Sequence, residues 1–370
     1  MNLLVPNLGS TSLKYQILEM PAETVLARGR FERVRDYREA IGQIQTAGVK
    51  VDAVAFKAVH GGPRYRGTFL VDAAVEQALE EFLPAAPAHN AIYLTAIRAF
   101  RESLPGVPLV AAFETEFHAL MPAHAREYGV PAEWREAGVA RYGFHGASHQ
   151  YVAERAAHIL GRSLRLVSCH LGGSSSMCAI DRGRSVDTTM GFSPQSGLEN
   201  ATRHGDLDVF AVLFMMERRS WSAAEVSSQL ARGGGLAGLS GIPGGDLRDL
   251  EQAGTEAARM AVAVFSYQVR KNIGAYAAAM GGLDAVAFAG GIGENSARLR
   301  AECCRGLEFL GVSLDPSRNE AGSGDRVVSS DSSPVTVLAL ATNEELIVAR
   351  RAYRCLRERD SIPGHEPLQT

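Results

Sequence analysis

The sequence has no Walker motif, no C-x-x-C pair and no long apolar or basic run. Without the Walker pattern, a P-loop nucleotide kinase is not predicted. No apolar segment reaches transmembrane length, and no basic region precedes an apolar one after Met1, so neither a membrane span nor a signal peptide is predicted. The net charge of −3 gives no support to a nucleic-acid or membrane partner.

Cysteine and lysine are both scarce. The five cysteines are odd in number, which is typical of reduced thiols in a cytoplasmic protein. The lysines are Lys14, Lys50, Lys57 and Lys271, and all other basic residues apart from histidine are arginines. Because the chain uses arginine wherever either residue would serve, each remaining lysine is expected to have a specific reason.

Length and patterning predict the fold class. A chain of 370 residues predicts two domains, and 46% hydrophobic with 21% charged residues is typical of a globular protein. Strands alternate with helices, which predicts an α/β fold with ligands beyond the carboxyl ends of strands. The expected helix N-caps are Asp72, Asn90 and Ser148. Strands are expected at 53–59, 109–113, 284–289 and 335–340, and helices at 73–83, 91–101, 148–160, 222–231 and 256–280.

Two glycine–serine hairpins are the most informative stretches. In residues 165–179, RLVSCHLGGSSSMCA, a buried strand enters a turn at Gly172 and Gly173, and a second strand begins near Met177. Residues 3–19 repeat this design. Glycine exposes backbone N–H groups and serine adds hydroxyl donors, so such a turn can bind a phosphate. Either stretch alone could be an ordinary hairpin, but the pair indicates two similar domains that share one phosphorylated ligand.

Three other patterns have simpler explanations. Residues 233–238 match G-x-G-x-x-G but follow a predicted helix, so they do not indicate a Rossmann site. His145 and His149 have i, i+4 spacing, but the helix is expected to begin between them, so zinc is not predicted. Residues 290–295, GGIGEN, follow a predicted strand and could either hold a nucleotide or form a plain glycine turn.

Phosphoryl transfer needs donors for phosphate oxygens, cations for the group in transfer and a carboxylate for Mg²⁺. The strand ends and loops supply groups of each kind: hairpin amides, Lys57, Arg203, His145, Glu114 and Glu344.

These residues lie in motifs that closely resemble the acetate kinase family, within the superfamily of acetate and sugar kinases, Hsp70 and actin. The resemblance runs from Asn7 to Leu346 and includes NLGSTSLKY, VHGGPRY, FETEFHALMP, RYGFHGASHQ, CHLGGSSS, TRHGDLD, FAGGIGENSARLR and TNEEL. It implies two duplicated actin-like (ribonuclease H-like) domains with an interdomain cleft, 1–147 and 148–345, with a final helix near 346–358 completing the first. It also implies ATP and Mg²⁺ as cofactors and a homodimer.

The resemblance also implies site residues. Catalytic roles fall on Arg203, His145, Glu114 and Lys57, and metal contacts on Asn7 and Glu344. Nucleotide contacts fall on Ser10, Ser12, Lys14, His170, Gly172, Gly173, Asp246, Arg248, Gly291, Ile292 and Asn295. The acyl pocket falls on Lys57, Val59, Ala88, Phe144 and Pro194.

Four positions depart from the family pattern. The family has arginine at Lys57, aspartate at Glu114, asparagine at Gly173 and leucine at Ala88. Lysine replaces a bidentate fork with a point charge, so Lys57 and Glu114 are interpreted as a changed pair. Ala88 predicts a wider acyl pocket and an acid larger than acetate. The predicted function is a carboxylate kinase. The alternatives are a weakly active paralogue, a sensor that binds nucleotide or acyl phosphate, and an enzyme using pyrophosphate, which the GGIGEN stretch disfavours.

Overall fold

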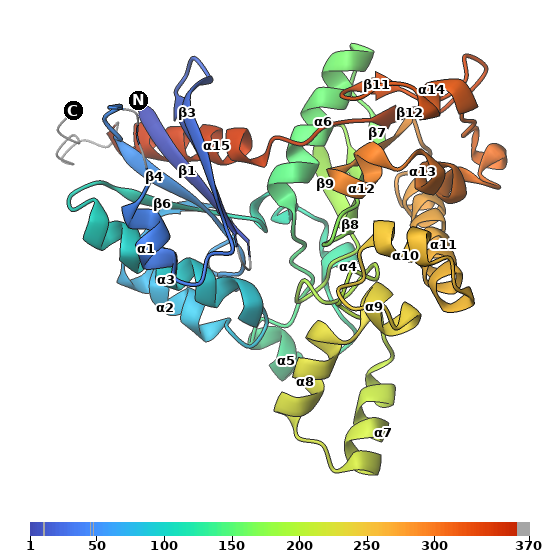
Figure 1. The fold of residues 1–370 in the computed structure, drawn as a ribbon, viewed down its shortest axis with the longest axis horizontal. Coiled ribbons are helices and arrows are strands. Elements are labelled where there is room, and N and C mark those ends of the chain that lie inside the picture. The colour runs from blue at the N-terminus through green and yellow to red at the C-terminus, as the bar shows by residue number, and fades with distance from the viewer. Residues whose placement is uncertain (10–11, 45, 47, 361–370) are drawn as a thin grey trace. The chain divides into compact units, whose positions relative to one another are not determined.

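The computed structural model describes residues 1–9, 12–44, 46 and 48–360, without the side chains of residues 87, 88 and 360. The chain divides into two compact units, each with its own sheet and helices (Figure 1). Unit 1 comprises residues 1–119, 146–148 and 343 onward, and unit 2 comprises residues 120–145 and 149–342.

Unit 1 is built on a six-stranded sheet in the order β3-β2-β1-β4-β6-β5. The first three strands pair antiparallel, β1, β4 and β6 run parallel, and β5 is an antiparallel edge. Helix α15 packs on β1, β4, β5 and β6, while α3 packs on β4 from the other face (Figure 1). The strands are β1 (Asn2–Leu8), β2 (Ser12–Glu19), β3 (Thr24–Glu32), β4 (Ala53–Ala58), β5 (Thr68–Leu70) and β6 (Leu109–Phe113). The helices are α1 (Tyr37–Gly42), α2 (Ala73–Glu81), α3 (Pro87–Ser103), the 3-10 turn Glu116–His118 and α15 (Glu344–Asp360).

Unit 2 has a second six-stranded sheet, ordered β11-β12-β10-β7-β8-β9. Its strands are β7 (Arg165–His170), β8 (Ser176–Asp181), β9 (Arg184–Thr188), β10 (Ala285–Ala289), β11 (Arg326–Val327) and β12 (Thr336–Ala339). Its helices are α4 (Ala123–Arg126), α5 (Ala132–Glu136), α6 (Gly146–Leu160, whose first three residues group with unit 1), α7 (Val209–Arg219), α8 (Ala223–Arg232), α9 (Gly235–Ser240), α10 (Leu247–Ala253), α11 (Glu256–Ala279), α12 (Gly290–Asn295), α13 (Ala297–Cys304), the 3-10 turn Glu308–Leu310 and α14 (Pro316–Glu320).

The two sheets are topological duplicates. Read from its other edge, the second sheet is β9-β8-β7-β10-β12-β11, which matches β3-β2-β1-β4-β6-β5 strand for strand. The directions also match: β7, β10 and β12 are parallel, β7–β8–β9 is an antiparallel meander and β11 is an antiparallel edge. The predicted α/β fold of duplicated actin-like domains is therefore confirmed.

Helix α11 supplies one wall of the core of unit 2. Its buried residues include Ala258, Ala261, Phe265, Val269 and Ile273, spaced three or four apart. This spacing places them on one helical face. That face packs with the apolar side chains of β7 and β8.

The predicted strands and the Asp72 cap are confirmed, but two predicted caps are wrong. Asn90 lies inside α3, where its side chain accepts from the His60 amide and donates to the carbonyls of His60 and Leu79 at 2.9–3.2 Å. The helix begins instead at Pro87, and proline is common at a first helical position.

Ser148 is likewise inside a helix, since α6 begins at Gly146. A Cβ at Gly146 would lie 2.1 Å from the carbonyl oxygen of Glu114, so this close approach requires glycine. The GGIGEN stretch forms the short helix α12 rather than an open turn, and Ser296 caps the helix that follows. Among the described residues, no helix is both long and apolar enough to cross a membrane.

Candidate functional site

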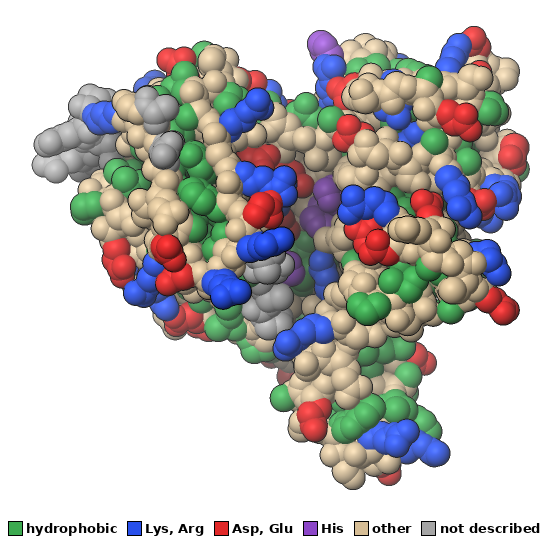
Figure 2. Space-filling model, in the orientation of Figure 1, with side chains coloured by type: hydrophobic (Ala, Val, Ile, Leu, Met, Phe, Trp, Pro, Cys, Tyr) green, Lys and Arg blue, Asp and Glu red, His purple; other side chains and the backbone are tan. Residues whose placement is uncertain are grey.

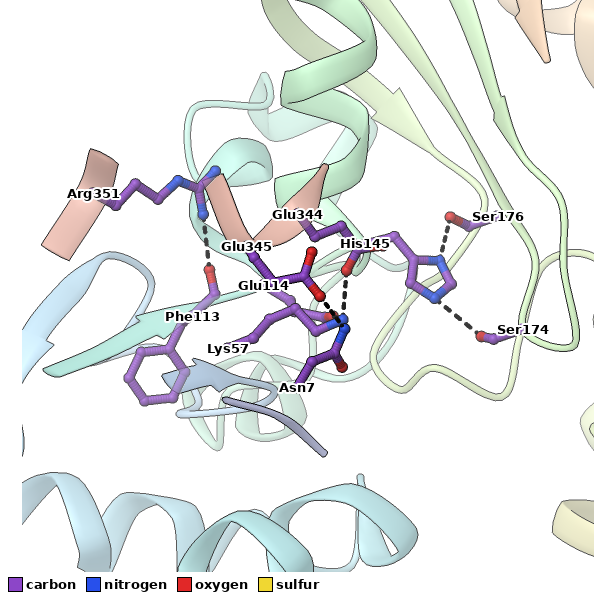
Figure 3. A network of polar contacts seen from close by, with 10 residues as sticks. All are labelled: Asn7, Lys57, Phe113, Glu114, His145, Ser174, Ser176, Glu344, Glu345 and Arg351. Carbon is purple, nitrogen blue, oxygen red and sulfur yellow. Dashed lines mark hydrogen bonds and ion pairs between the residues drawn. The ribbon is translucent and has the colours of Figure 1, made fainter. Parts of the chain in front are cut away.

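Unit 1 gathers one cation and two carboxylates where its central strands end. The Nζ atom of Lys57 lies 2.5 Å from Oε2 of Glu344 and 3.4 Å from Oε1 of Glu114 (Figure 3). Only 17% of the Lys57 side chain is exposed, with 13% for Glu344 and 7% for Glu114. Burial alone would lower the pKa of Lys57, but the two carboxylates hold it well above its ordinary value. Lys57 therefore stays protonated at neutral pH.

The fold explains why residues so distant in sequence meet here. Lys57 on β4 pairs in register with Ala112 on the parallel strand β6, and Glu114 directly follows β6. Glu344 begins α15, which is anchored when Arg351 donates to the carbonyl of Phe113 at 3.4 Å (Figure 3). The positions predicted to have changed together, 57 and 114, thus form an ion pair.

Other predicted residues of unit 1 lie on the first hairpin. Asn7 on β1 donates from Nδ2 to Oε1 of Glu345 at 2.7 Å. Ser12 and Lys14 lie on β2, where Lys14 is exposed, and Ser10 is outside the described residues. Sequence reasoning missed Glu345, although it neighbours Glu344 in TNEEL. It also missed Tyr93, a buried residue of α3 whose pKa is raised by burial and which interacts electrostatically with Lys57.

In unit 2, His145 lies between two hydroxyls of the second hairpin. Its Nδ1 is 2.8 Å from Ser176 Oγ and its Nε2 is 3.0 Å from Ser174 Oγ (Figure 3). The ring of His170, at the end of β7, lies 4.4 Å from the His145 ring, centroid to centroid. The hairpin predicted to bind phosphate thus carries one imidazole, that of His170, and a second, that of His145, lies beside its hydroxyls.

The helix does not begin between His145 and His149, contrary to the prediction from sequence. Since α6 begins at Gly146, His149 follows on the first turn and its Nε2 lies 2.8 Å from the same Ser176 hydroxyl. The two rings therefore converge on one oxygen atom. Throughout the part of the chain that the structure describes, no group of three or more His, Cys, Asp or Glu residues is arranged to hold a metal ion.

A pocket of about 830 Å³ in unit 2 is lined by the second hairpin, α10 and α12. The carbonyl of Leu171 joins hairpin and helix, since it accepts from the amides of Ile292 and Gly293 at 2.9 and 3.1 Å. Gly290 has φ +76°, and a Cβ there would lie 2.7 Å from that carbonyl, so this joint requires glycine. The lining includes the predicted nucleotide residues Gly172, Gly173, Asp246, Arg248, Gly291, Ile292 and Asn295.

Arg203 lies on the irregular loop that follows β9. Its Nη1 donates to the carbonyl of Pro194 at 2.6 Å, which fixes the guanidinium to the start of the same loop. Burial raises the pKa of Glu199 and lowers that of His204 on this loop. The loop therefore holds several buried polar groups close to Arg203 in sequence.

The predicted acyl-pocket residues are distributed over both units. Val59 is buried just after β4 in unit 1, whereas Phe144 and Pro194 are buried in unit 2. The Ala88 side chain is outside the described part of the chain. The acyl pocket and its predicted widening at Ala88 stay predictions.

A duplicated actin-like fold, with a glycine-lined pocket in one unit and a buried cation–carboxylate cluster in the other, fits the class of nucleotide-dependent phosphotransferases. Comparison with known families is consistent with this class, because the model of the acetokinase family matches residues 38–350. The chain belongs to the acetokinase family. It is therefore a phosphotransferase with a carboxyl group as acceptor.

Individual relatives match along nearly their whole length. The acetate kinase of Geobacillus kaustophilus is 42% identical, with 95% of this chain and 98% of the relative covered. That of Thermotoga maritima is 41% identical, with 95% and 97% covered. Among solved structures, acetate kinase from Porphyromonas gingivalis has a TM-score of 0.84 at 35% identity, covering 96% and 99%. Propionate kinase from Francisella tularensis has a TM-score of 0.86 at 30% identity, covering 95% and 98%.

Proposed function

We propose that this chain transfers the terminal phosphoryl group between ATP and a short-chain carboxylate, giving an acyl phosphate and ADP. The acid is acetate or a somewhat larger one. The observation that carries the proposal is the pocket of unit 2, because seven residues that the family resemblance implies as nucleotide contacts line one cavity of about 830 Å³. The relatives are named as acetate or propionate kinases, which supports turnover rather than binding alone.

The nucleotide would bind in this pocket. Gly172, Gly173 and Gly291 have no side chains, so phosphate oxygens can approach the backbone N–H groups closely. Asp246, the N-cap of α10, and Arg248, on its first turn, border the pocket and would lie against the adenosine. His170 would contact the phosphates from the end of β7.

The carboxylate substrate would bind at Lys57. A carboxylate oxygen attacks the γ-phosphorus in line, a new P–O bond forms as the bond to the β-phosphate oxygen breaks, and ADP leaves with that oxygen. No covalent enzyme intermediate is needed. His145 and Arg203 would donate hydrogen bonds to the oxygens of the transferred group, which is electrostatic stabilisation by preorganised donors.

Magnesium fits the chemistry of the oxygen donors in unit 1. Magnesium is usually held by one or two carboxylates together with phosphates and water. Glu344, directly or through water, and Asn7 would be those donors, since each contributes a side-chain oxygen at this end of the sheet. When bound, the ion would neutralise phosphate charge.

The assembly we propose is a homodimer. Helix α7 exposes Val209, Phe210, Leu213 and Phe214, each at least half exposed. Hydrophobic side chains gather at the tip of Figure 2 that corresponds to α7 in Figure 1. Exposed apolar patches of this kind mark interaction sites, and a second copy is the occupant we propose. We place the protein in the cytoplasm, which the five free cysteines support.

A hydroxamate assay with ATP, Mg²⁺ and a panel of acids tests the proposed reaction. The panel contains acetate, propionate, butyrate, a hydroxy acid and an amino acid. We expect turnover with at least one short-chain acid, and loss of turnover with retained ADP binding in Arg203→Met. ADP binding without turnover for any acid in the unaltered chain would instead indicate a sensor. Acetate preferred over all other acids would contradict a widened acyl pocket.

A further inference from the structure

A chain of hydrogen bonds runs from the second hairpin into the core of unit 2. It passes from Ser174 to His145, then to Ser176, His149 and Ser168, through contacts of 3.0, 2.8, 2.8 and 2.8 Å. Ser176, His149 and Ser168 are completely buried, on β8, α6 and β7. Figure 3 shows the outer part of this chain, with the His145 ring between two serine hydroxyls.

The buried end of this chain, at Ser168, determines which group donates in each hydrogen bond. In the described part of the chain, His149 Nδ1 is the partner that the structure gives to the Ser168 hydroxyl. A buried hydroxyl proton without an acceptor costs about 1–3 kcal/mol, so Ser168 donates to Nδ1 of His149. The neutral His149 ring then carries its proton on Nε2 and donates to Ser176.

The Ser176 hydroxyl has a single proton, and its oxygen contacts the imidazoles of both His145 and His149. Because the oxygen accepts from His149 Nε2–H, the hydroxyl proton is directed to Nδ1 of His145. The neutral His145 ring must then carry its proton on Nε2. That nitrogen points to Ser174, on the turn of the second hairpin.

We propose that Ser168, His149 and Ser176 are positioning residues that hold His145 in the Nε2–H tautomer. His145 can then donate to a phosphoryl oxygen as a neutral ring, with that oxygen taking the place of the Ser174 hydroxyl. This inference rests on the proposed function for the role of the donor, but the tautomer itself does not depend on that function. The device resembles the way a buried partner sets the tautomer of a catalytic histidine in other enzymes.

Nitrogen-15 NMR of the histidine-labelled full chain, without nucleotide, tests the tautomer directly. The spectra of His145→Gln and His149→Gln assign the two rings. We expect both rings to be unprotonated at Nδ1 and protonated at Nε2, and Ser168→Ala to weaken this preference in both. A proton on Nδ1 of His145 in the unaltered chain would overturn the proposal.

Kinetics of Ser176→Ala test whether the positioning matters for turnover. Removing one preorganised donor costs about 100- to 1,000-fold in kcat, so misdirecting it should lower kcat by about 10- to 100-fold. The matched control is Ser185→Ala, which removes another buried hydroxyl of unit 2, one that contacts Cys178 Sγ at 3.3 Å.

We expect the KM for ATP to change no more in Ser176→Ala than in Ser185→Ala, and Ser176→Thr to keep most of the kcat. An unchanged kcat in Ser176→Ala would refute the positioning role even if the NMR tautomer is as expected. If the unaltered chain has no turnover with any acid, the proposed function fails, and the NMR result still decides whether the hydrogen-bonded chain sets the tautomer.

Discussion

Replacing Lys57 with methionine should destabilise the protein by about 3–5 kcal/mol, the cost of breaking a buried ion pair by removing one partner. Lys57 is the cation between Glu344 at 2.5 Å and Glu114 at 3.4 Å, and all three side chains are less than one-fifth exposed. Methionine is unbranched and only one atom shorter than lysine, so the loss is mainly electrostatic rather than steric. Two poorly solvated carboxylates would then remain with no cation between them.

Urea denaturation followed by circular dichroism, with EDTA present, measures this loss. Lys50→Met is the matched control, because it makes the same substitution at an exposed lysine and should change stability by less than about 0.5 kcal/mol. The double variant Lys57→Met/Glu114→Gln should recover part of the loss, since one carboxylate is neutralised. A loss below about 1 kcal/mol, or no recovery in the double variant, would refute the electrostatic account.

Three further outcomes follow from the contacts. Gly173→Asn should fold normally, because a Cβ there meets nothing within 4 Å, and should lower the KM for ATP; an unchanged KM would contradict a phosphate role for that position. Hydrogen bonds from Arg165 lower the pKa of Asp284, so Asp284→Asn should cost about 1 kcal/mol at pH 7 because solvent screens this partly exposed pair. Urea titrations should show the difference vanishing as the pH falls through that lowered pKa. Burial and Arg326 lower the pKa of Arg300 to about 10, and its guanidinium donates to carbonyls of α12, so Arg300→Met should weaken ADP binding in calorimetry more than Arg300→Lys does.

Much of the fold was predictable because its signals are local. The hairpins at Gly172 and near Asn7 combine an apolar strand with glycine and hydroxyl residues, and both form as expected. The N-caps failed where a distant partner decided the geometry. Asn90 has the right side chain for a cap, but it donates both amide protons to the carbonyls of His60 and Leu79 and accepts from the His60 amide, so tertiary contacts override the local preference.

The types of residue in the site were predictable from the sequence, but the contacts between their side chains were not. Sequence identified Lys57, Glu114 and Glu344, yet which carboxylate lies nearer to the lysine depends on where α15 begins relative to β4, and no local pattern contains that information. For His149, the sequence offers only the i, i+4 spacing from His145, which does not identify its partner. Its contact with Ser176 depends on α6 beginning two residues before Ser148, which follows from the close approach of Gly146 to Glu114 rather than from a capping side chain.

Because the two sheets are duplicates, the charged cluster of unit 1 and the glycine-lined pocket of unit 2 can be compared position by position. The penultimate residue of the central parallel strand is Lys57 in unit 1 and Phe288 in unit 2. Phe288 is fully buried among β7 and β12, whereas Lys57 reaches two carboxylates. A residue at this position is apolar and packs in the core unless partners stabilise its charge, as Glu114 and Glu344 do for Lys57. In unit 2 the polar chemistry therefore begins one step later, beyond Ala289, where glycines expose backbone amides instead of side-chain charges.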